Sequence, residues 1–248
     1  MIKPTRRNKQ SGYSARMNRH VAIFLFLLSC VAVPVRAADA PAERTLVLVR
    51  HGNYLPDPKA DERLGPHLSP LGSAQARLVG ARLAGMPGRF DHLYASPVQR
   101  ARDTAAIIGE SFPGRRFEVV DDLSECTPHT WRTDVTKDEK PEDMATCKAQ
   151  LDRVFARFFH PAAGQPETDL LVCHGNVIRY LVTRALGVDT DAWLGMSVGH
   201  ASITRIRVKA DGGISVIAVG DVGHIPPNML SGASGDPRER SLEIPTLP

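Results

Sequence analysis

Short apolar runs alternate with longer amphipathic stretches along this chain. The runs 46–49 and 169–173 consist almost entirely of aliphatic residues, which is typical of strands that are covered on both faces. The clearest helix is predicted over 144–158, where apolar residues recur with the 3.6-residue period of one helix face. Further strands are predicted at 92–95, 117–120, 203–208 and 214–219, and further helices at 70–84, 97–112 and 176–186.

This order of elements predicts the fold class and the domain boundaries. Strands that alternate with helices favour an α/β protein, a three-layer α/β/α sandwich with a mostly parallel central sheet. The last two strands are predicted to form a hairpin. One domain over 46–227 accounts for the whole alternation. A linker is expected at 38–45, and a flexible tail rich in proline, glycine, serine and charge is expected at 228–248.

The first 37 residues have the composition of a targeting segment. Seven lysines and arginines and no acidic residue occur there, and an apolar run over 21–35 follows the basic start. Small residues precede the bond after Ala37, so we expect a secretory signal peptide over 1–37. The expected location is secreted, in the bacterial periplasm. Two alternatives stay open, namely a translation start at Met17 and a lipoprotein anchored through Cys30.

Removal of this segment reverses the sign of the net charge. The full chain of 248 residues carries 31 Lys and Arg against 27 Asp and Glu, a net charge of +4. Without residues 1–37 the balance becomes 24 basic against 27 acidic residues, a net charge of −3. This weakly acidic balance gives no support for nucleic-acid binding, so no nucleic-acid partner is expected.

Three cysteines, Cys126, Cys147 and Cys173, lie beyond the N-terminal segment. An oxidising compartment would permit a disulfide between Cys126 and Cys147. The odd number of cysteines, and the lack of a metal-type spacing such as CxxC, leave free or buried thiols as an equal alternative. Cys173 lies inside an apolar strand, and we expect it in the core.

Two short polar motifs follow two of the predicted buried strands. Arg50-His51-Gly52 comes directly after the first, and His174-Gly175-Asn176 directly after the run that ends at Cys173. Arg100 lies in the first turn of the helix that Ser96-Pro97 is predicted to begin. In sheets of this type ligands bind beyond the carboxyl ends of the strands, so we expect these side chains to converge. Arginine forks and helix N-termini suit the oxygens of a phosphoryl group.

Each of these residue types can take a part in phosphoryl transfer. An imidazole with a pKa of about 6.5 is a competent nucleophile near neutral pH, and we assign this part to His51. His174 and the two arginines would stabilise charge on the phosphoryl oxygens. Glu125, just after the strand predicted at 117–120, is the carboxylate best placed to protonate the leaving oxygen and then to activate water. The neighbouring acidic alternatives are Asp121 and Asp122.

In order and spacing, the motifs resemble those of the histidine phosphatase superfamily, which has the phosphoglycerate mutase-like fold. The resemblance spans about 46–227 and rests on Arg50-His51-Gly52, Leu68-Ser-Pro-Leu-Gly72 with Gln75, Ser96 to Ala105, and His174-Gly175-Asn176. The resemblance implies that His51 is the nucleophile and that Glu125 is the acid and base. It also implies a phosphate pocket formed by Arg50, Arg100 and His174.

The C-terminal half is similar to one branch, the mitochondrial serine/threonine protein phosphatases of the phosphoglycerate mutase family. The similar segments are His174 to Tyr180, Trp193 to Ser197, Ala201 to Thr204 and Gly220 to Pro227. The expected substrate-binding residues are Arg50, Gly52, Asn53, Arg100, His174 and Gly175. Family members usually carry Glu or Gln where this chain has Asn53, which weakens the case for a substrate contact by that side chain.

These observations predict a secreted, metal-independent phosphatase that forms a phosphohistidine. It would be a phosphoric monoester hydrolase of the histidine acid phosphatase type, without a cofactor. No metal is expected, because the other histidines lack HxxxH or HxH spacing. The expected substrate is a phosphorylated small molecule or a phosphoprotein, and the branch suggests a homo-oligomer. The alternatives are a phosphoglycerate mutase-like phosphoryl transferase and a catalytically weak phosphate-binding or interaction protein.

Overall fold

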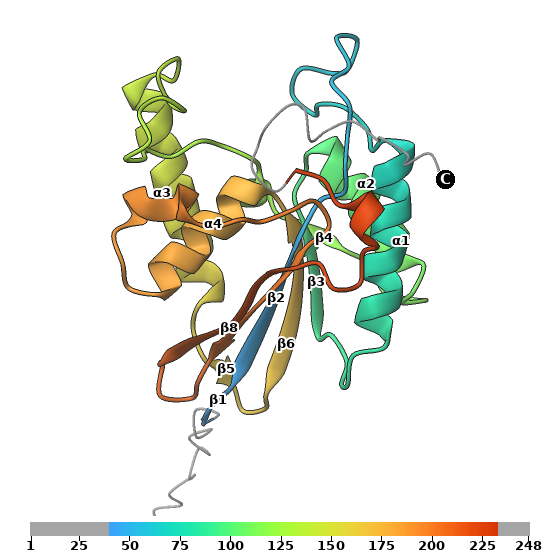
Figure 1. Ribbon diagram of the computed structural model, residues 1–248. Helices are drawn as coiled ribbons and strands as arrows, with labels where there is room; N and C mark the ends of the chain where they lie inside the picture. Colours follow the sequence, from blue (N-terminus) through green and yellow to red (C-terminus); the bar gives the residue numbers. More distant parts are fainter. Residues whose placement is uncertain (1–39, 233–248) are drawn as a thin grey trace, which may run out of the picture. The chain divides into compact units, whose positions relative to one another are not determined.

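The computed structural model describes residues 40–232, and in this part of the chain six strands form the main sheet. Their spatial order is β4-β3-β6-β2-β7-β8 (Figure 1). Their bounds are Arg44–Arg50 (β2), His92–Ala95 (β3), Glu118–Val119 (β4), Glu167–Cys173 (β6), Ile203–Val208 (β7) and Ile214–Asp221 (β8). The strands from β4 to β2 run parallel, whereas β7 and β8 are antiparallel to their neighbours. The sheet is therefore mostly parallel.

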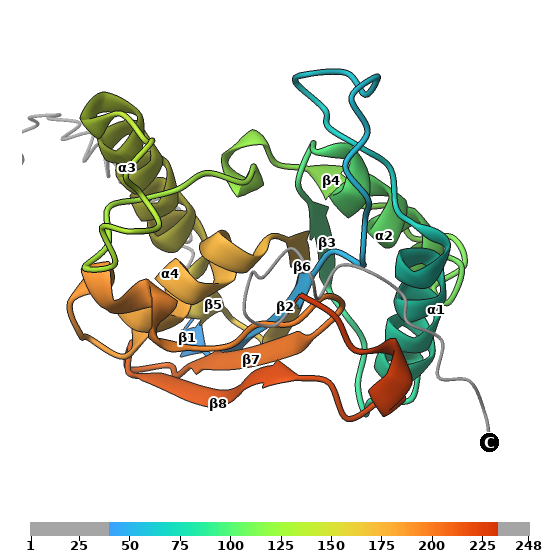
Figure 2. The ribbon, with the colours of Figure 1, turned by 45° about the horizontal axis from the view of Figure 1, so that its top comes forward.

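Four α-helices cover the faces of this sheet within residues 40–232. They are α1 (Pro70–Ala84), α2 (Gln99–Gly109), α3 (Pro141–Phe158) and α4 (Gly175–Ala185). Short 3₁₀ helices lie at Asp121–Leu123 (η1), Thr190–Gly195 (η2) and Pro227–Met229 (η3). Figure 2 shows α1 and α2 on one side of the sheet and α3 and α4 on the other. The predicted three-layer α/β/α sandwich is confirmed.

Two apolar cores, one on each face of the sheet, hold these layers together. Leu46 and Leu48 of β2 pack into the core under α3 and α4, whereas Val47 and Val49 pack into the core under α1 and α2. All four side chains are completely buried. A strand that is covered on both faces needs apolar residues at every position, which explains why the run 46–49 shows no alternation of polar and apolar residues.

The two helices on one face begin differently, although both follow a Ser-Pro pair. Ser69 caps α1 as predicted, because its Oγ accepts a hydrogen bond from the Gly72 N–H at 3.1 Å. The second pair predicts a helix over 97–112, but α2 is shorter, Gln99–Gly109. Ser96 Oγ lies 2.8 Å from Nε2 of His174, so this serine faces the neighbouring strand end and does not cap α2.

Most other boundaries lie within a few residues of their predictions, and the hairpin of β7 and β8 forms as expected. One pairing was not predicted: β1 (Pro41–Ala42) and β5 (Ala162–Ala163) form a small antiparallel sheet. The first residues of the predicted tail are also held, since Gln75 Nε2 donates to the carbonyl of Met229 and the His200 N–H to that of Ser231.

The predicted signal peptide (1–37), Cys30 within it, and residues 233–248 of the predicted tail lie outside the described residues. Within 40–232, no helix is both long enough and apolar enough to cross a membrane. Cys126 and Cys147 form a disulfide, with their Cα atoms 5.6 Å apart, which decides between the two alternatives that the cysteine count left open. Cys173 is a free, buried thiol.

Candidate active site

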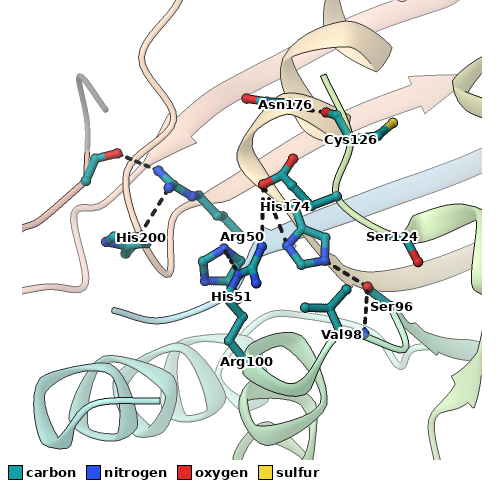
Figure 3. A network of polar contacts seen from close by, with 12 residues as sticks. Arg50, His51, Ser96, Val98, Arg100, Ser124, Cys126, His174, Asn176 and His200 are labelled. Carbon is teal, nitrogen blue, oxygen red and sulfur yellow. Dashed lines mark hydrogen bonds and ion pairs between the residues drawn. The ribbon is translucent and has the colours of Figure 1, made fainter. Parts of the chain in front are cut away.

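Two histidines lie at the carboxyl edge of the sheet because their strands are parallel neighbours. β2 and β6 pair in register up to Arg50 and Cys173, and the His51 N–H donates to the Cys173 carbonyl at 2.9 Å. His51 and His174 each follow the end of one of these strands, and their ring centroids lie 5.1 Å apart. Both rings are almost fully buried. Figure 3 shows both rings among the two arginines that the sequence singles out.

The hydrogen bonds of His51 define which ring nitrogen carries the proton. Nδ1 lies 2.8 Å from the carbonyl oxygen of Gly52, which can only accept, so Nδ1 is the protonated nitrogen. Nε2 then has a lone pair, and it accepts a hydrogen bond from Nε of Arg100 at 3.1 Å. Burial, followed by the positive charge of Arg100, lowers the pKa of His51 well below its ordinary value. The ring is therefore neutral at neutral pH, with a nucleophilic Nε2.

His174 is held in a similar neutral state. Its Nε2 lies 2.8 Å from Ser96 Oγ, while its buried Nδ1 has no hydrogen-bond partner within the described residues. Burial is the main cause that lowers its pKa, and the charges of Arg100 and Arg50 add to it. An unpaired buried nitrogen at a strand end is available to an oxygen of a bound ligand.

Two arginines supply the positive charge of the site. Arg100, in the first turn of α2, stacks over the Tyr54 ring at 4.9 Å and lies 3.9 Å from the Glu125 carboxylate. Arg50 donates to the Val198 carbonyl at 2.6 Å and also to the Gly232 carbonyl. Burial lowers the pKa of Arg50 to about 10, so that its guanidinium stays charged at neutral pH. Its Nε is buried without a protein partner in the described part of the chain, and this leaves one donor for a ligand.

Glu125 lies close to both histidine rings, in the segment after η1. Its Oε2 is 3.7 Å from Nδ1 of His174, and its side chain keeps 26% of its surface exposed. Burial of the carboxyl group raises its pKa, against the opposing charges of Arg100 and Arg50. A raised pKa keeps a larger fraction protonated, which suits a proton donor.

Gly52, Asn53 and Gly175 were predicted to bind substrate. In the structure, their contacts are mainly with neighbouring parts of the chain. The Asn53 amide Oδ1 accepts from Ser69 Oγ at 2.7 Å, so this side chain joins the loop after β2 to the start of α1. A Cβ on Gly52 would lie 2.5 Å from the carbonyl of Gly72, and a Cβ on Gly175 would lie 3.2 Å from Nε of Arg50. The two glycines therefore allow close approach of other groups to the site.

The sequence did not single out His200 and Ser96 as site residues. His200 is buried, lies 3.2 Å from a terminal nitrogen of Arg50, and its ring centroid is 5.4 Å from that of His51. Ser96 follows β3, the parallel neighbour of β6, so it occupies the same kind of strand-end position as the two histidines. That position is a signal that sequence reasoning could have used for Ser96. His200 has no comparable signal.

Two groups of described residues bring metal-ligating atoms within 4.8 Å of one another. They are His51 with Glu125 and His174, and His92 with Glu167 and Asp169. In the first group, Arg50 and Arg100 repel a cation and attract an anion. In the second group, the Arg44 guanidinium forms ion pairs with both carboxylates and so already neutralises their negative charge. The first arrangement can bind a phosphoryl group and offer it a nucleophile and a proton donor.

Beside Glu125 lies a cavity of about 610 Å³. It is lined by residues of the loop after Glu125, of α4, of η2 and of the segment just after η2, among them Thr127, Arg132, Asn176, Arg179, Trp193 and Ser197. Trp193 is buried in its wall and donates from Nε1 to the carbonyl of His129 at 3.0 Å.

Comparisons with known proteins agree with this geometry. A model of the histidine phosphatase superfamily (branch 1) matches residues 46–220. The mitochondrial serine/threonine-protein phosphatase Pgam5 of Caenorhabditis briggsae is 36% identical over 197 residues, which cover 77% of this chain and 68% of that protein. Its counterpart from Mus musculus is 33% identical, with coverage of 77% and 67%.

Solved structures show the same fold. A phosphoglycerate mutase from Plasmodium falciparum superposes with a TM-score of 0.53 at 25% identity, over 75% of this chain and 95% of that one. A mycobacterial glucosyl-3-phosphoglycerate phosphatase superposes with a TM-score of 0.52 at 21% identity, over 72% and 99% of the two chains.

The expectation of a secreted, periplasmic protein is wrong, whereas the signal peptide expected over 1–37 stays a prediction. The relatives at 33–36% identity are named as mitochondrial proteins. The error has a physical reason. Secretory signals and mitochondrial targeting segments are both basic and poor in acidic residues, so the charge of residues 1–37 does not separate them.

Proposed function

The chain belongs to branch 1 of the histidine phosphatase superfamily and is a phosphoric monoester hydrolase; from this premise we propose that it works without a metal ion, through a phosphohistidine on His51. The observation that carries the proposal is the pair of contacts of the His51 ring. Nδ1 holds the proton against the Gly52 carbonyl, so that Nε2 presents a lone pair to the pocket between the arginines. The nucleophilic nitrogen therefore lies in the same place as the positive charges that would bind a phosphoryl group.

In the first step, Nε2 of His51 attacks phosphorus. The N–P bond forms, the bond from phosphorus to the ester oxygen breaks, and the leaving oxygen takes the proton of the Glu125 carboxyl group. Negative charge on the phosphoryl oxygens is stabilised by Arg50, Arg100 and Nδ1 of His174. Arg100 already donates to Nε2, so its donor turns to a phosphoryl oxygen as the nucleophile engages.

In the second step, water cleaves the phosphohistidine. Glu125, now a carboxylate, takes a proton from the water as its oxygen attacks phosphorus, and the N–P bond breaks. Inorganic phosphate leaves, His51 regains its lone pair and Glu125 its proton. The carboxyl group thus serves both steps, and burial, which raises its pKa, favours the protonated form that the first step needs.

We further propose that the substrate is a phosphoserine or phosphothreonine side chain of a protein. The relatives named above are serine/threonine-protein phosphatases, which supports this choice over a phosphorylated small molecule. The cavity beside Glu125 offers about 610 Å³ for the chain that carries the phosphate. An alkoxide is a poor leaving group, and the nearby carboxyl group would supply the proton that it needs.

The test is hydrolysis of p-nitrophenyl phosphate by the full chain and by His51→Ala, each with an excess of EDTA. We expect EDTA-resistant turnover in the wild type and none in the variant. A rapidly quenched reaction with ³²P-labelled substrate should give protein-bound label that survives alkali and is lost in acid, as phosphohistidine is. Turnover that EDTA abolishes, or full activity of His51→Ala, would overturn the proposal. A panel of phosphopeptides against sugar phosphates then tests the substrate class.

A mitochondrial location follows from the same relatives and is proposed here with them. The seven basic residues and the absence of acidic ones over 1–37 are compatible with such targeting. Fusion of residues 1–37 to a fluorescent reporter checks it: the reporter should be imported by isolated mitochondria, and a reporter left outside contradicts the proposal.

A further inference from the structure

Glu125 lies in a part of the chain that has no regular secondary structure of its own. From η1 to the start of α3, residues 124–140 form neither helix nor strand. The loop continues past Glu125 to exposed residues such as Trp131, whose exposed fraction is 64%. A carboxyl group that passes a proton to one oxygen atom must nevertheless be held within a fraction of an ångström. The restraint has to come from neighbouring elements.

α3 holds the chain on both sides of Glu125. Nε2 of Gln150 donates to the carbonyls of Asp122 and Ser124, each at 2.9 Å, just before Glu125. Cys147 is bonded through its sulfur to Cys126, just after Glu125. Cys147 and Gln150 are three residues apart, which places them on the same face of the helix. One helix face therefore brackets the carboxyl-bearing residue with a covalent bond and two hydrogen bonds.

α4 adds a third restraint from the other direction. Nδ2 of Asn176 donates to the carbonyl of Cys126 at 3.2 Å, and Figure 3 shows this contact beside the ring of His174. The backbone N–H of the same residue, in the first turn of α4, interacts with the Glu125 carboxylate. Asn176 thus contacts both the main chain and the side chain of this segment.

We propose that Cys147, Gln150 and Asn176 form a clamp that positions Glu125 for proton transfer to the leaving oxygen, and that the Cys126–Cys147 disulfide is its essential member. The inference rests on the proposed part of Glu125 as the acid. Among the three contacts, the disulfide alone is covalent, and it closes a loop over a sequence separation of 21 residues. Opening it returns conformational freedom to the chain next to Glu125.

The consequence is a selective loss of acid catalysis, not a loss of the fold. His51 and His174 directly follow β2 and β6, Arg50 ends β2, and Arg100 lies on α2, so the polypeptide segments that carry these four residues are not joined to α3 by the disulfide. A dithiol reagent such as dithiothreitol supplies the two electrons: it leaves thiols on Cys126 and Cys147 and becomes a cyclic disulfide. Reduced enzyme should still form the phosphohistidine, provided that the leaving group needs no proton.

The experiment compares two aryl esters of similar size, p-nitrophenyl phosphate and phenyl phosphate. Phenol has a pKa of about 10, and its anion needs protonation far more than the weakly basic p-nitrophenolate. After reduction, or in the double variant Cys126→Ser with Cys147→Ser, we expect kcat/KM for phenyl phosphate to fall about tenfold or more, because kcat/KM reports only the steps up to release of the leaving group and not the later attack of water. The fall for p-nitrophenyl phosphate should stay below about threefold. Gln150→Ala should show the same discrimination to a smaller degree.

Three controls separate the outcomes. Lys148→Ala changes an exposed residue of the same helix, next to Cys147, and should leave both substrates unaffected. Dithiothreitol should not change the double serine variant further, which ties the effect to this disulfide. Glu125→Gln sets the full size of the leaving-group effect, and circular dichroism confirms that each variant is folded.

Equal losses of kcat/KM on both substrates in the reduced enzyme would overturn the clamp as a positioning device, because a general disturbance of the site does not distinguish leaving groups. Equal losses in Glu125→Gln would instead overturn the acid role itself. If the double serine variant does not fold, the two substrates are compared in the reduced wild type and in Gln150→Ala instead.

Discussion

Nε of Arg100 donates a hydrogen bond to Nε2 of His51 across 3.1 Å. The lone pair that would attack phosphorus is therefore covered in the free protein by a group that also suits the phosphoryl oxygens. Substrate binding and release of the nucleophile become one event, because the arginine must turn from the ring to the ligand. This relationship explains why the side chain needs an arginine fork, and not merely a positive charge.

Arg100→Lys should therefore impair catalysis although it keeps the charge. An ammonium group at this site lacks the planar fork that can bond to the ring and then to two oxygens. We expect kcat/KM for p-nitrophenyl phosphate to fall roughly 10- to 100-fold. Arg102→Lys, two residues along the same helix on an exposed position, is the matched control and should remain at the wild-type level. Wild-type kinetics in Arg100→Lys would contradict the requirement for a fork.

The dependence of kcat/KM on pH should be bell-shaped. His51 must be neutral, and its pKa is lowered below the ordinary 6.5, so activity falls only when the pH drops below that lowered pKa. Glu125 must be protonated, and its pKa is raised above the ordinary 4.5, so activity falls as the pH rises through the raised pKa. Both pKa shifts widen the pH range in which His51 is neutral while Glu125 is protonated.

Glu125→Gln tests the assignment of the alkaline limb. Because the amide does not titrate, the decline at higher pH should disappear in profiles of phenyl phosphate hydrolysis from about pH 4 to about pH 9. The acidic limb should remain, since it belongs to the His51 ring. If the decline at higher pH persisted unchanged in the variant, the titration of a group other than Glu125 would be its cause.

Gly72→Ala should lower both the stability of the protein and its rate of catalysis. A Cβ at this position would lie 1.9 Å from the carbonyl oxygen of Asn53, so the start of α1 and the loop that follows His51 must move apart. We expect a loss of about 1–3 kcal/mol in the free energy of unfolding, measured by urea denaturation, with a lower kcat. Gly85→Ala is the control, because its nearest atom would be 3.6 Å away. Equal stability of the two variants would refute the argument from close packing.

Ser96→Ala removes the partner of His174 Nε2. The ring is completely buried, so its nitrogen loses a hydrogen bond that water cannot readily replace, at a cost of about 1–3 kcal/mol. The ring then becomes less well oriented, and kcat should fall about 5- to 50-fold with a smaller change in KM. Ser73→Ala, which removes a hydrogen bond from α1 to the carbonyl of its N-cap Ser69, should leave both constants unchanged. Unchanged kinetics in Ser96→Ala would show that His174 needs no such support.

Local patterns in the sequence were sufficient for the fold and for the meeting of three candidate site residues at one edge of the sheet. Apolar runs predicted β2 and β6, and the rule that ligands bind beyond strand ends brought Arg50, His51 and His174 together before any coordinates. The same rule applied to β3 would have found Ser96. Composition was a poorer guide: the basic N-terminal segment suggested secretion, and the mitochondrial relatives overturned it.

The sequence by itself determined the order of strands and helices, because the periodicity of apolar residues reports which faces of an element are buried. Tertiary structure alone decided the pairing of Cys126 with Cys147, the bracketing of Glu125 by Gln150 and Asn176, and the contact of Arg50 with His200. These contacts join segments far apart in the chain. Their partners depend on how whole helices pack on the sheet, and no local pattern of residues records that packing.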